Sequence, residues 1–134
     1  SWKAESAEYD EADGSKSYSL CLYGNGRDAR SIDLSIGTIP EGSDAYVEAS
    51  RAYEDVICEE DLQKNDEPIV SFDFQNRRAY GFNILTDDGM PCFFFCVGLP
   101  SLGKNSLLTV LACAPNEKQL QNLVAFVEEN LSVE

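Results

Sequence analysis

The chain has 134 residues, of which 43% are hydrophobic and 10% aromatic, a size and composition that suit one folded domain and exclude wholesale disorder. Its 24 acidic and 10 basic residues leave a net charge of −14, which excludes nucleic acid and anionic membrane surfaces as expected partners. The chain has no histidine, so Ser-His-Asp, Cys-His and imidazole-metal sites are excluded within it. We therefore expect a soluble domain with a solvating acidic surface or a basic partner protein.

The first 16 residues are polar and acidic apart from Trp2, Tyr9 and a few alanines. An Asp-Gly-Ser turn signal closes this segment at 13–15. We predict one domain over 1–134 in which 1–16 form a tail or a docked helix. The two aromatic side chains are expected to pack on the protein's own sheet or to dock on a partner.

Two stretches with a period of two follow this segment and predict strands at 18–24 and 31–37. The pair Asn25-Gly26 between them favours a hairpin loop, so we expect these strands to pair with each other. They alternate apolar and polar residues better than the later strands do, which places them at the edges of the sheet.

A helix is predicted at about 44–58, with Ser43 as its N-cap and apolar residues at helical spacing. From 41 to 67 there are ten Asp and Glu against Arg51 and Lys64. The order of these acids does not match a calcium-binding loop, so a solvated helix end is favoured over a metal site. The outward acidic face is our candidate partner-binding surface and comprises Asp44, Glu48, Asp55, Glu59, Glu60 and Asp61.

A meander of four strands is predicted next, at 69–74, 79–85, 91–97 and 107–113, with Arg77 and Arg78 in a turn. The last two strands are apolar on both faces, so they should be central and covered on both sides. A closing amphipathic helix is predicted with Asn116 as its cap. Its buried stripe comprises Leu120, Leu123, Val124, Val127 and Leu131.

Together these elements predict an α+β fold in which an antiparallel sheet of about six strands carries amphipathic helices on its faces, like an α/β/α sandwich. Two covered faces need either a third helix from residues 1–13 or a dimer that buries the exposed side. The protein is therefore expected to be a monomer or a homodimer.

The five cysteines are odd in number and include no close Cys-x-x-Cys spacing. Cys92 and Cys96 are four strand positions apart, about 13 Å, which is beyond the reach of a disulfide or a shared metal. We therefore predict reduced, buried thiols and a cytoplasmic location. The chain does not begin with Met, so an exported protein that has lost its signal peptide is the alternative. No apolar run is long enough to span a membrane.

Catalytic motifs are missing from the sequence. Asp87 and Asp88 precede Gly89 and are typical of a turn rather than of a glycosidase acid and base. The loop at 98–104 lacks the ending of a phosphate-binding loop. We predict no catalytic residues, no metal site and no cofactor.

The order of two strands, a helix, a four-strand meander and a final helix over 17–131 resembles the Mog/PsbP-like fold, most closely in the closing stretch LLTVLACAPNEKQLQNLVAFVEENL. The resemblance implies a binding or assembly factor rather than an enzyme, and no functional residue of that family maps onto this chain. We therefore expect a small acidic non-enzymatic binding or accessory domain for a basic protein. The alternatives are a sequestering chaperone or immunity-type protein for a basic effector and, third, an enzyme that uses carboxylates or a thiol.

Overall fold

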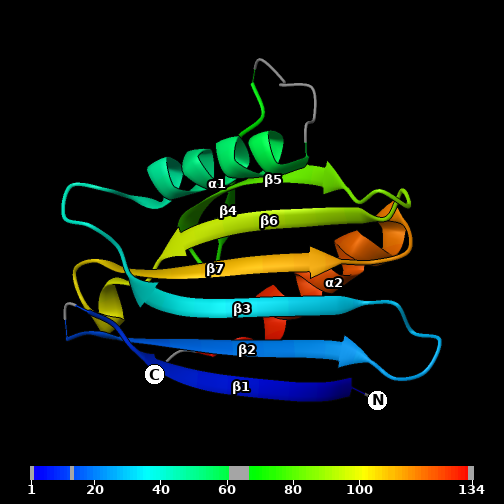
Figure 1. Ribbon diagram of the computed structural model, residues 1–134, viewed down its shortest axis with the longest axis horizontal. Coiled ribbons are helices and arrows are strands. Elements are labelled where there is room, and N and C mark those ends of the chain that lie inside the picture. The colour runs from blue at the N-terminus through cyan, green and yellow to red at the C-terminus, as the bar shows by residue number, and fades with distance from the viewer. Residues whose placement is uncertain (1, 13, 61–66, 133–134) are drawn as a thin grey trace.

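A computed structural model describes residues 2–12, 14–60 and 67–132, with only the backbone of Glu60 described (Figure 1). Within these residues, seven strands, two α-helices and one short 3₁₀ helix follow one another. In order these are β1 (Trp2–Asp10), β2 (Lys16–Gly24), β3 (Ser31–Thr38), α1 (Ala45–Glu60), β4 (Val70–Phe74), β5 (Arg77–Leu85), β6 (Pro91–Gly98), η1 (Pro100–Leu102), β7 (Ser106–Cys113) and α2 (Glu117–Asn130).

The strands form one antiparallel sheet in the order β1-β2-β3-β7-β6-β5-β4. The α+β prediction is therefore confirmed, as are the hairpin of β2 with β3 and the four-strand meander. β7 is the central strand and β6 lies beside it, as their two apolar faces predicted.

The amino-terminal segment was predicted as a tail or a helix, which is wrong. Residues 2–10 form β1, which pairs along its whole length with β2, so the sheet has one strand more than expected. β1 lacks the alternation of apolar and polar residues from which a strand is predicted. Side-chain hydrogen bonds link it to β2 instead: the Tyr23 hydroxyl donates to Glu5 at 2.8 Å, and Lys16 donates to Glu8 at 2.8 Å. The predicted edge positions of β2 and β3 are wrong for the same reason, since β1 and β4 are the edges.

The two helices pack on opposite faces of the sheet (Figure 1). Successive strand residues point to opposite faces, so the aromatic run of β6 divides between them. Phe94 stacks on Phe82 on the α1 side with ring centroids 5.0 Å apart, and Tyr53 of α1 meets Phe82 at 5.3 Å. Phe95 packs on the other face against Phe74 at 5.2 Å, in the core that α2 covers. α2 buries the predicted stripe against this face through Leu120, Leu123 and Val127.

Both helices begin at polar caps. The carboxylate of Asp44 accepts a hydrogen bond from the backbone N–H of Val47 at 2.9 Å, so Asp44 rather than Ser43 caps α1. The predicted cap of α2 is confirmed, because the side chain of Asn116 accepts from the N–H of Gln119 at 2.9 Å.

The turn before β5 is shorter than predicted. Gln75 and Asn76 have φ of 51° and 65°, which is the left-handed backbone of a tight hairpin. Arg77 and Arg78 therefore do not lie in the turn but begin the strand.

The helices cover the sheet unevenly. α1 packs on β5 and β6, and α2 packs on β6 and β7. On the α1 side, no helix of the described residues therefore lies above the strands β1, β2 and β3 (Figure 1). This open half of the sheet, beside the acidic flank of α1, forms the candidate site.

Candidate functional site

One flank of α1 carries a row of carboxylates. Asp44, Glu48, Asp55 and Glu59 are four, seven and four residues apart, a spacing that puts them on one side of the helix. The buried side of α1 carries Ala49 and Tyr53 instead. The helix therefore presents its acids along the border of the sheet's open half.

Two of these acids already have intramolecular partners. Asp44 caps the helix, as described above. Glu48 accepts hydrogen bonds from the hydroxyl of Ser43 at 2.5 Å and from Arg51 at 3.0 Å. Asp55 and Glu59 are exposed. The latter two are therefore the carboxylates of the predicted surface that are best placed to meet a partner's cation.

A groove of about 330 Å³ lies at the foot of this flank, and we call it the acidic groove. α1 contributes Glu48, Arg51 and Asp55 to its wall. Hydroxyl groups of β3 and β7 line the other side, namely Ser35, Thr38 and Thr109. Carboxylates that face hydroxyl oxygens suit a ligand that brings hydrogen-bond donors, such as an ammonium or guanidinium group.

The groove continues over the open half of the sheet. A second hollow of about 310 Å³ shares Ser35, Phe94 and Thr109 with the acidic groove and extends to Cys21 and Asp33 on β2 and β3. The two hollows are therefore adjacent. Together they lead from the acids of α1 to an acid of β3.

Two carboxylates that flank β2 accept hydrogen bonds from its side chains: Asp33 accepts from the Cys21 thiol and Glu5 from the Tyr23 hydroxyl. The hydrogen bond to Asp33, burial, and the charges of Asp33 and Glu5 raise the pKa of Cys21 to about 11. The hydrogen bond from the Tyr23 hydroxyl to Glu5 likewise raises the pKa of that tyrosine. The Cys21 thiol therefore stays protonated at neutral pH and adds no negative charge beside Asp33 and Glu5.

The structure brings together part of the predicted surface. Asp44, Glu48, Asp55 and Glu59 share one flank, whereas Asp61 lies outside the described residues and Glu60 is described by its backbone alone. Sequence analysis missed Glu5 and Asp33. Asp33 could have been found from the alternation of its strand, because Ile32 and Leu34 lie on one face of the strand and Asp33 on the other.

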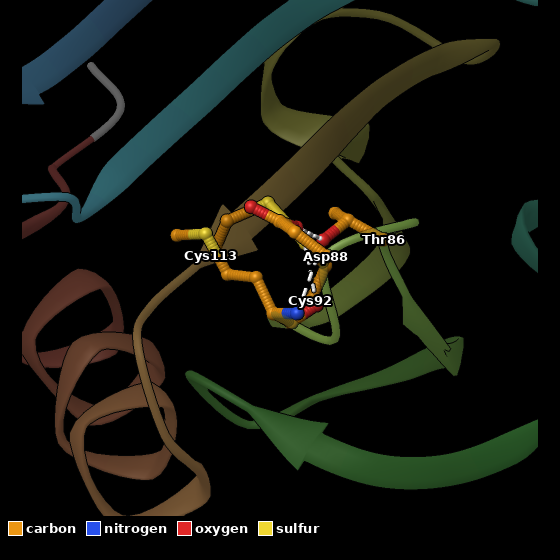
Figure 2. Close-up of a disulfide and its surroundings, with 5 residues drawn as sticks. Thr86, Asp88, Cys92 and Cys113 are labelled. Atoms are coloured by element: carbon orange, nitrogen blue, oxygen red, sulfur yellow. Dashed lines mark hydrogen bonds between the residues drawn. A yellow bond between two sulfur atoms is a disulfide. The ribbon is translucent and has the colours of Figure 1, made fainter.

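The cysteines differ from the prediction. Cys92 and Cys113, which are register partners in β6 and β7, form a disulfide (Figure 2). The prediction of reduced thiols is therefore wrong for these two, because the chain brings Cys113 opposite Cys92 from a distance of 21 residues. Cys21, Cys58 and Cys96 are free, and only Cys96 is buried.

Cys96 points to the α1 side beneath the acidic groove. Burial, with a further contribution from the charge of Glu48, raises its pKa to about 11. A thiol with such a pKa is protonated at neutral pH and is a poor nucleophile. Cys96 is therefore a core residue that happens to border the groove.

The predicted turn at Asp87 and Asp88 is confirmed. The side chains of Thr86 and Asp88 are hydrogen-bonded to each other, and the N–H of Gly89 donates to the Thr86 carbonyl at 2.9 Å. Figure 2 shows Thr86 and Asp88 beside the disulfide. The bond from Thr86 lowers the pKa of Asp88, so its carboxyl stays ionised, as suits a turn former rather than a general acid.

Within the described ranges, no group of three or more metal-ligating side chains gathers, and no helix is long and apolar enough to cross a membrane. Comparison with protein-family models, with curated proteins and with solved structures finds no significant match. The resemblance to the Mog/PsbP-like fold therefore stays a prediction.

Proposed function

We propose that this protein is a small non-enzymatic binding or accessory domain whose acidic groove receives a basic segment of a partner protein. The observation that carries this proposal is the position of Glu48 and Asp55 in the wall of an open, hydroxyl-lined groove. Glu59 follows Asp55 one turn further along the same flank of α1. The net charge of −14 would speed the encounter with such a partner.

The pKa values of two free thiols support a role without catalysis. Cys21 and Cys96 are protonated at neutral pH, so neither is an activated nucleophile. Of the groove carboxylates, Asp55 is exposed and Glu48 is held by hydrogen bonds from Ser43 and Arg51.

The disulfide changes the proposed location. The cytoplasmic prediction depended on free thiols, and Cys92 and Cys113 are joined. Disulfides persist mainly in oxidising compartments, so we propose that the protein acts outside the reducing cytoplasm.

The test uses a peptide of alternating lysine and glycine residues, which carries the charge but has little tendency to form a strand. The double variant Asp55→Ala/Glu59→Ala should bind this peptide about fivefold more weakly than the wild type at low salt, because each exposed ion pair contributes ~0.2–1 kcal/mol. The difference should disappear at high salt. Isothermal titration calorimetry measures the affinity, and the melting temperature should stay unchanged because both side chains are exposed.

A matched control removes the same charge elsewhere. Asp87 and Glu129 are exposed and lie outside the groove, so Asp87→Ala/Glu129→Ala should bind the peptide as the wild type does. Equal weakening by both double variants would show that net charge alone attracts the peptide. Binding that is independent of salt would also contradict the proposal.

A further inference from the structure

β1 leaves one edge of the sheet unpaired. It runs beside β2 at the bottom of Figure 1, and within the described residues no strand pairs with its other side. β1 has nine residues, against five in β4 at the opposite edge. Its register with β2 is one to one from Trp2 to Asp10, so no bulge interrupts the edge.

The hairpin geometry shows which backbone groups of β1 face outward. The N–H of Glu11 donates to the carbonyl of Ser15 at 2.9 Å, so this pair is hydrogen-bonded. Hydrogen-bonded and non-bonded pairs alternate along an antiparallel ladder. Glu5 and Ala7 therefore bond to β2, whereas the even-numbered residues, such as Ser6, turn their N–H and C=O groups to the free edge.

The next ladder confirms this assignment. The N–H of Gly24 donates to the carbonyl of Arg30 at 3.0 Å, so even-numbered residues of β2 bond to β3. The odd-numbered residues of β2 are then the ones that bond to β1, in agreement with the pairs Glu5–Cys21 and Ala7–Ser19.

An apolar groove borders this edge on the α2 side of the sheet. It has a volume of about 480 Å³, and Ser6 and Glu8 of β1 belong to its rim. Its other lining side chains come mostly from β2, β3 and the end of α2 and include Tyr18, Leu20, Leu34, Ile36, Leu108 and Leu131. Apolar side chains of an added strand would therefore extend this surface.

The same edge is polar on the α1 side. The side chains of Lys3, Glu5, Ala7 and Tyr9 lie there, and Tyr9 is 55% exposed. Asp33 lies on the same face two strands away. Glu8 and Asp10 point to the other side, where both form ion pairs with Lys16. Beyond Lys3 along β1, basic side chains of an added strand would meet a carboxylate at Glu5 and an aromatic ring at Tyr9.

We propose that β1 is a docking edge at which an extended segment of a partner protein adds to the sheet as a further strand. The segment would alternate basic residues, facing the α1 side, with apolar residues, facing the apolar groove. Backbone hydrogen bonds to the even-numbered residues of β1 hold it, and the two faces select its sequence. This proposal does not depend on the acidic groove.

Charge favours such a partner over a second copy of this chain. β1 carries Glu5, Glu8 and Asp10 against the single Lys3, and each chain carries −14 overall. Two copies that each carry −14 repel each other, which disfavours pairing of β1 with itself. A strand with lysine or arginine at alternate positions gains attraction instead.

The test uses a peptide of alternating lysine and valine residues as long as β1. Ser6→Pro removes one outward N–H and leaves the ladder to β2 intact, since proline is tolerated at an edge. We expect this variant to bind the peptide about tenfold more weakly, because it loses one backbone hydrogen bond and the ring obstructs the edge. The matched control Ser6→Ala keeps the N–H and should bind as the wild type does.

Amide hydrogen exchange locates the peptide. The amides of Ala4, Ser6 and Glu8 should exchange fast in the free protein and become protected in the complex. Those of Glu5 and Ala7 should be protected in both states. A peptide with methyl groups on those alternate backbone nitrogens that face β1 should not bind, because it cannot complete the ladder.

Three results would overturn the proposal. The first is an absence of binding or of new protection at the even-numbered amides. The second is protection of these amides without peptide in a species of dimer mass by analytical ultracentrifugation, which would make the occupant a second copy. The third is loss of binding in Asp55→Ala/Glu59→Ala but not in Ser6→Pro, which would place the peptide in the acidic groove and leave the proposed function standing.

Discussion

The two halves of the sheet are built differently. In the half from β4 to β7, the aromatic rings of Phe72, Phe74, Phe82, Phe94 and Phe95 pack beneath the helices. In the half from β1 to β3, the α1 face has no helix, and its side chains are mostly hydroxyls, acids and a thiol. Both halves share one continuous ladder of backbone hydrogen bonds.

This difference separates stability from recognition. Burial of apolar area stabilises the covered half on both faces. The open half contributes to the core only on its α2 side, through Ile32 and its neighbours, and its α1 side has only backbone pairing and exposed polar contacts that contribute little each. The side chains on an exposed sheet face can change without disturbing the hydrophobic core, so such a face is free to serve in binding. The open half is therefore where we place both candidate binding surfaces.

Removal of a central ring should have the largest effect. Phe95 is fully buried, and its ring centroid lies 5.2 Å from those of Phe72 and Phe74. Phe95→Ala should lower the free energy of unfolding by about 3–5 kcal/mol. Leu20→Ala, at a partly exposed position of the open half, should lower it by less than about 1.5 kcal/mol. Equal losses in urea denaturation would mean that the halves are packed alike.

The disulfide belongs to the covered half and should rank second. Replacing both partners, as in Cys92→Ala/Cys113→Ala, should lower the free energy of unfolding by about 3 kcal/mol, because the bridge closes a loop of 21 residues in the unfolded chain. A reductant should destabilise the wild type by a similar amount and leave the double variant unaffected. Cys58→Ala, which changes a free exposed thiol, serves as the control. An identical urea midpoint for double variant and wild type would contradict this prediction.

Two glycines offer a finer comparison within the covered half. A Cβ atom at Gly81 would lie 2.3 Å from the carbonyl oxygen of Phe94 and 2.7 Å from the Cβ of Phe95. Gly81→Ala should therefore cost about 1–3 kcal/mol of stability through overpacking. Gly98 has nothing within 4 Å of the same position, so Gly98→Ala should be nearly neutral. Thermal unfolding compares the two, and the prediction is wrong if they shift the melting temperature equally.

The smallest effect is expected in the open half, at Asp28. Arg30 donates to this carboxylate at 2.6 and 2.9 Å, and its guanidinium also lies 4.6 Å from the ring centroid of Trp2. The side-chain and backbone hydrogen bonds from Arg30 lower the pKa of Asp28 to about 2.

A folded-state pKa below the unfolded value, about 4, means that the ionised carboxylate stabilises the fold above that pH. The contribution is then lost as the pH falls from about 4 through 2. Asp28→Asn should therefore lower the melting temperature slightly at neutral pH, and the difference from the wild type should shrink over that range. A difference that stays constant with pH would show that the ionised pair contributes nothing.

Much of the covered half could be predicted from the sequence. The run from Pro91 to Gly98 is apolar on both faces, which requires a central strand, and the stripe that includes Leu120 and Val127 requires a helix packed on a sheet. The acidic flank of α1 was also predictable, because the spacing of Asp55 and Glu59 follows the helical period.

The open half was less predictable, and the errors share one cause. β1 has no apolar alternation, so its strand state depends on pairing with β2 and on bonds such as Tyr23 to Glu5. In the covered half, the unpredicted disulfide between Cys92 and Cys113 depends likewise on which strands become neighbours. The periodicity of a single segment does not reveal which strand it pairs with or which cysteine lies opposite another.

The sequence alone thus determined the elements whose own apolar pattern must be buried, together with the sign of the surface charge. Tertiary structure decided which strand lies at each edge, which cysteines meet, and that the acids of α1 border an open sheet face. The physical reason is that burial acts through the side chains of each segment, whereas pairing depends on backbone groups that every segment has in common.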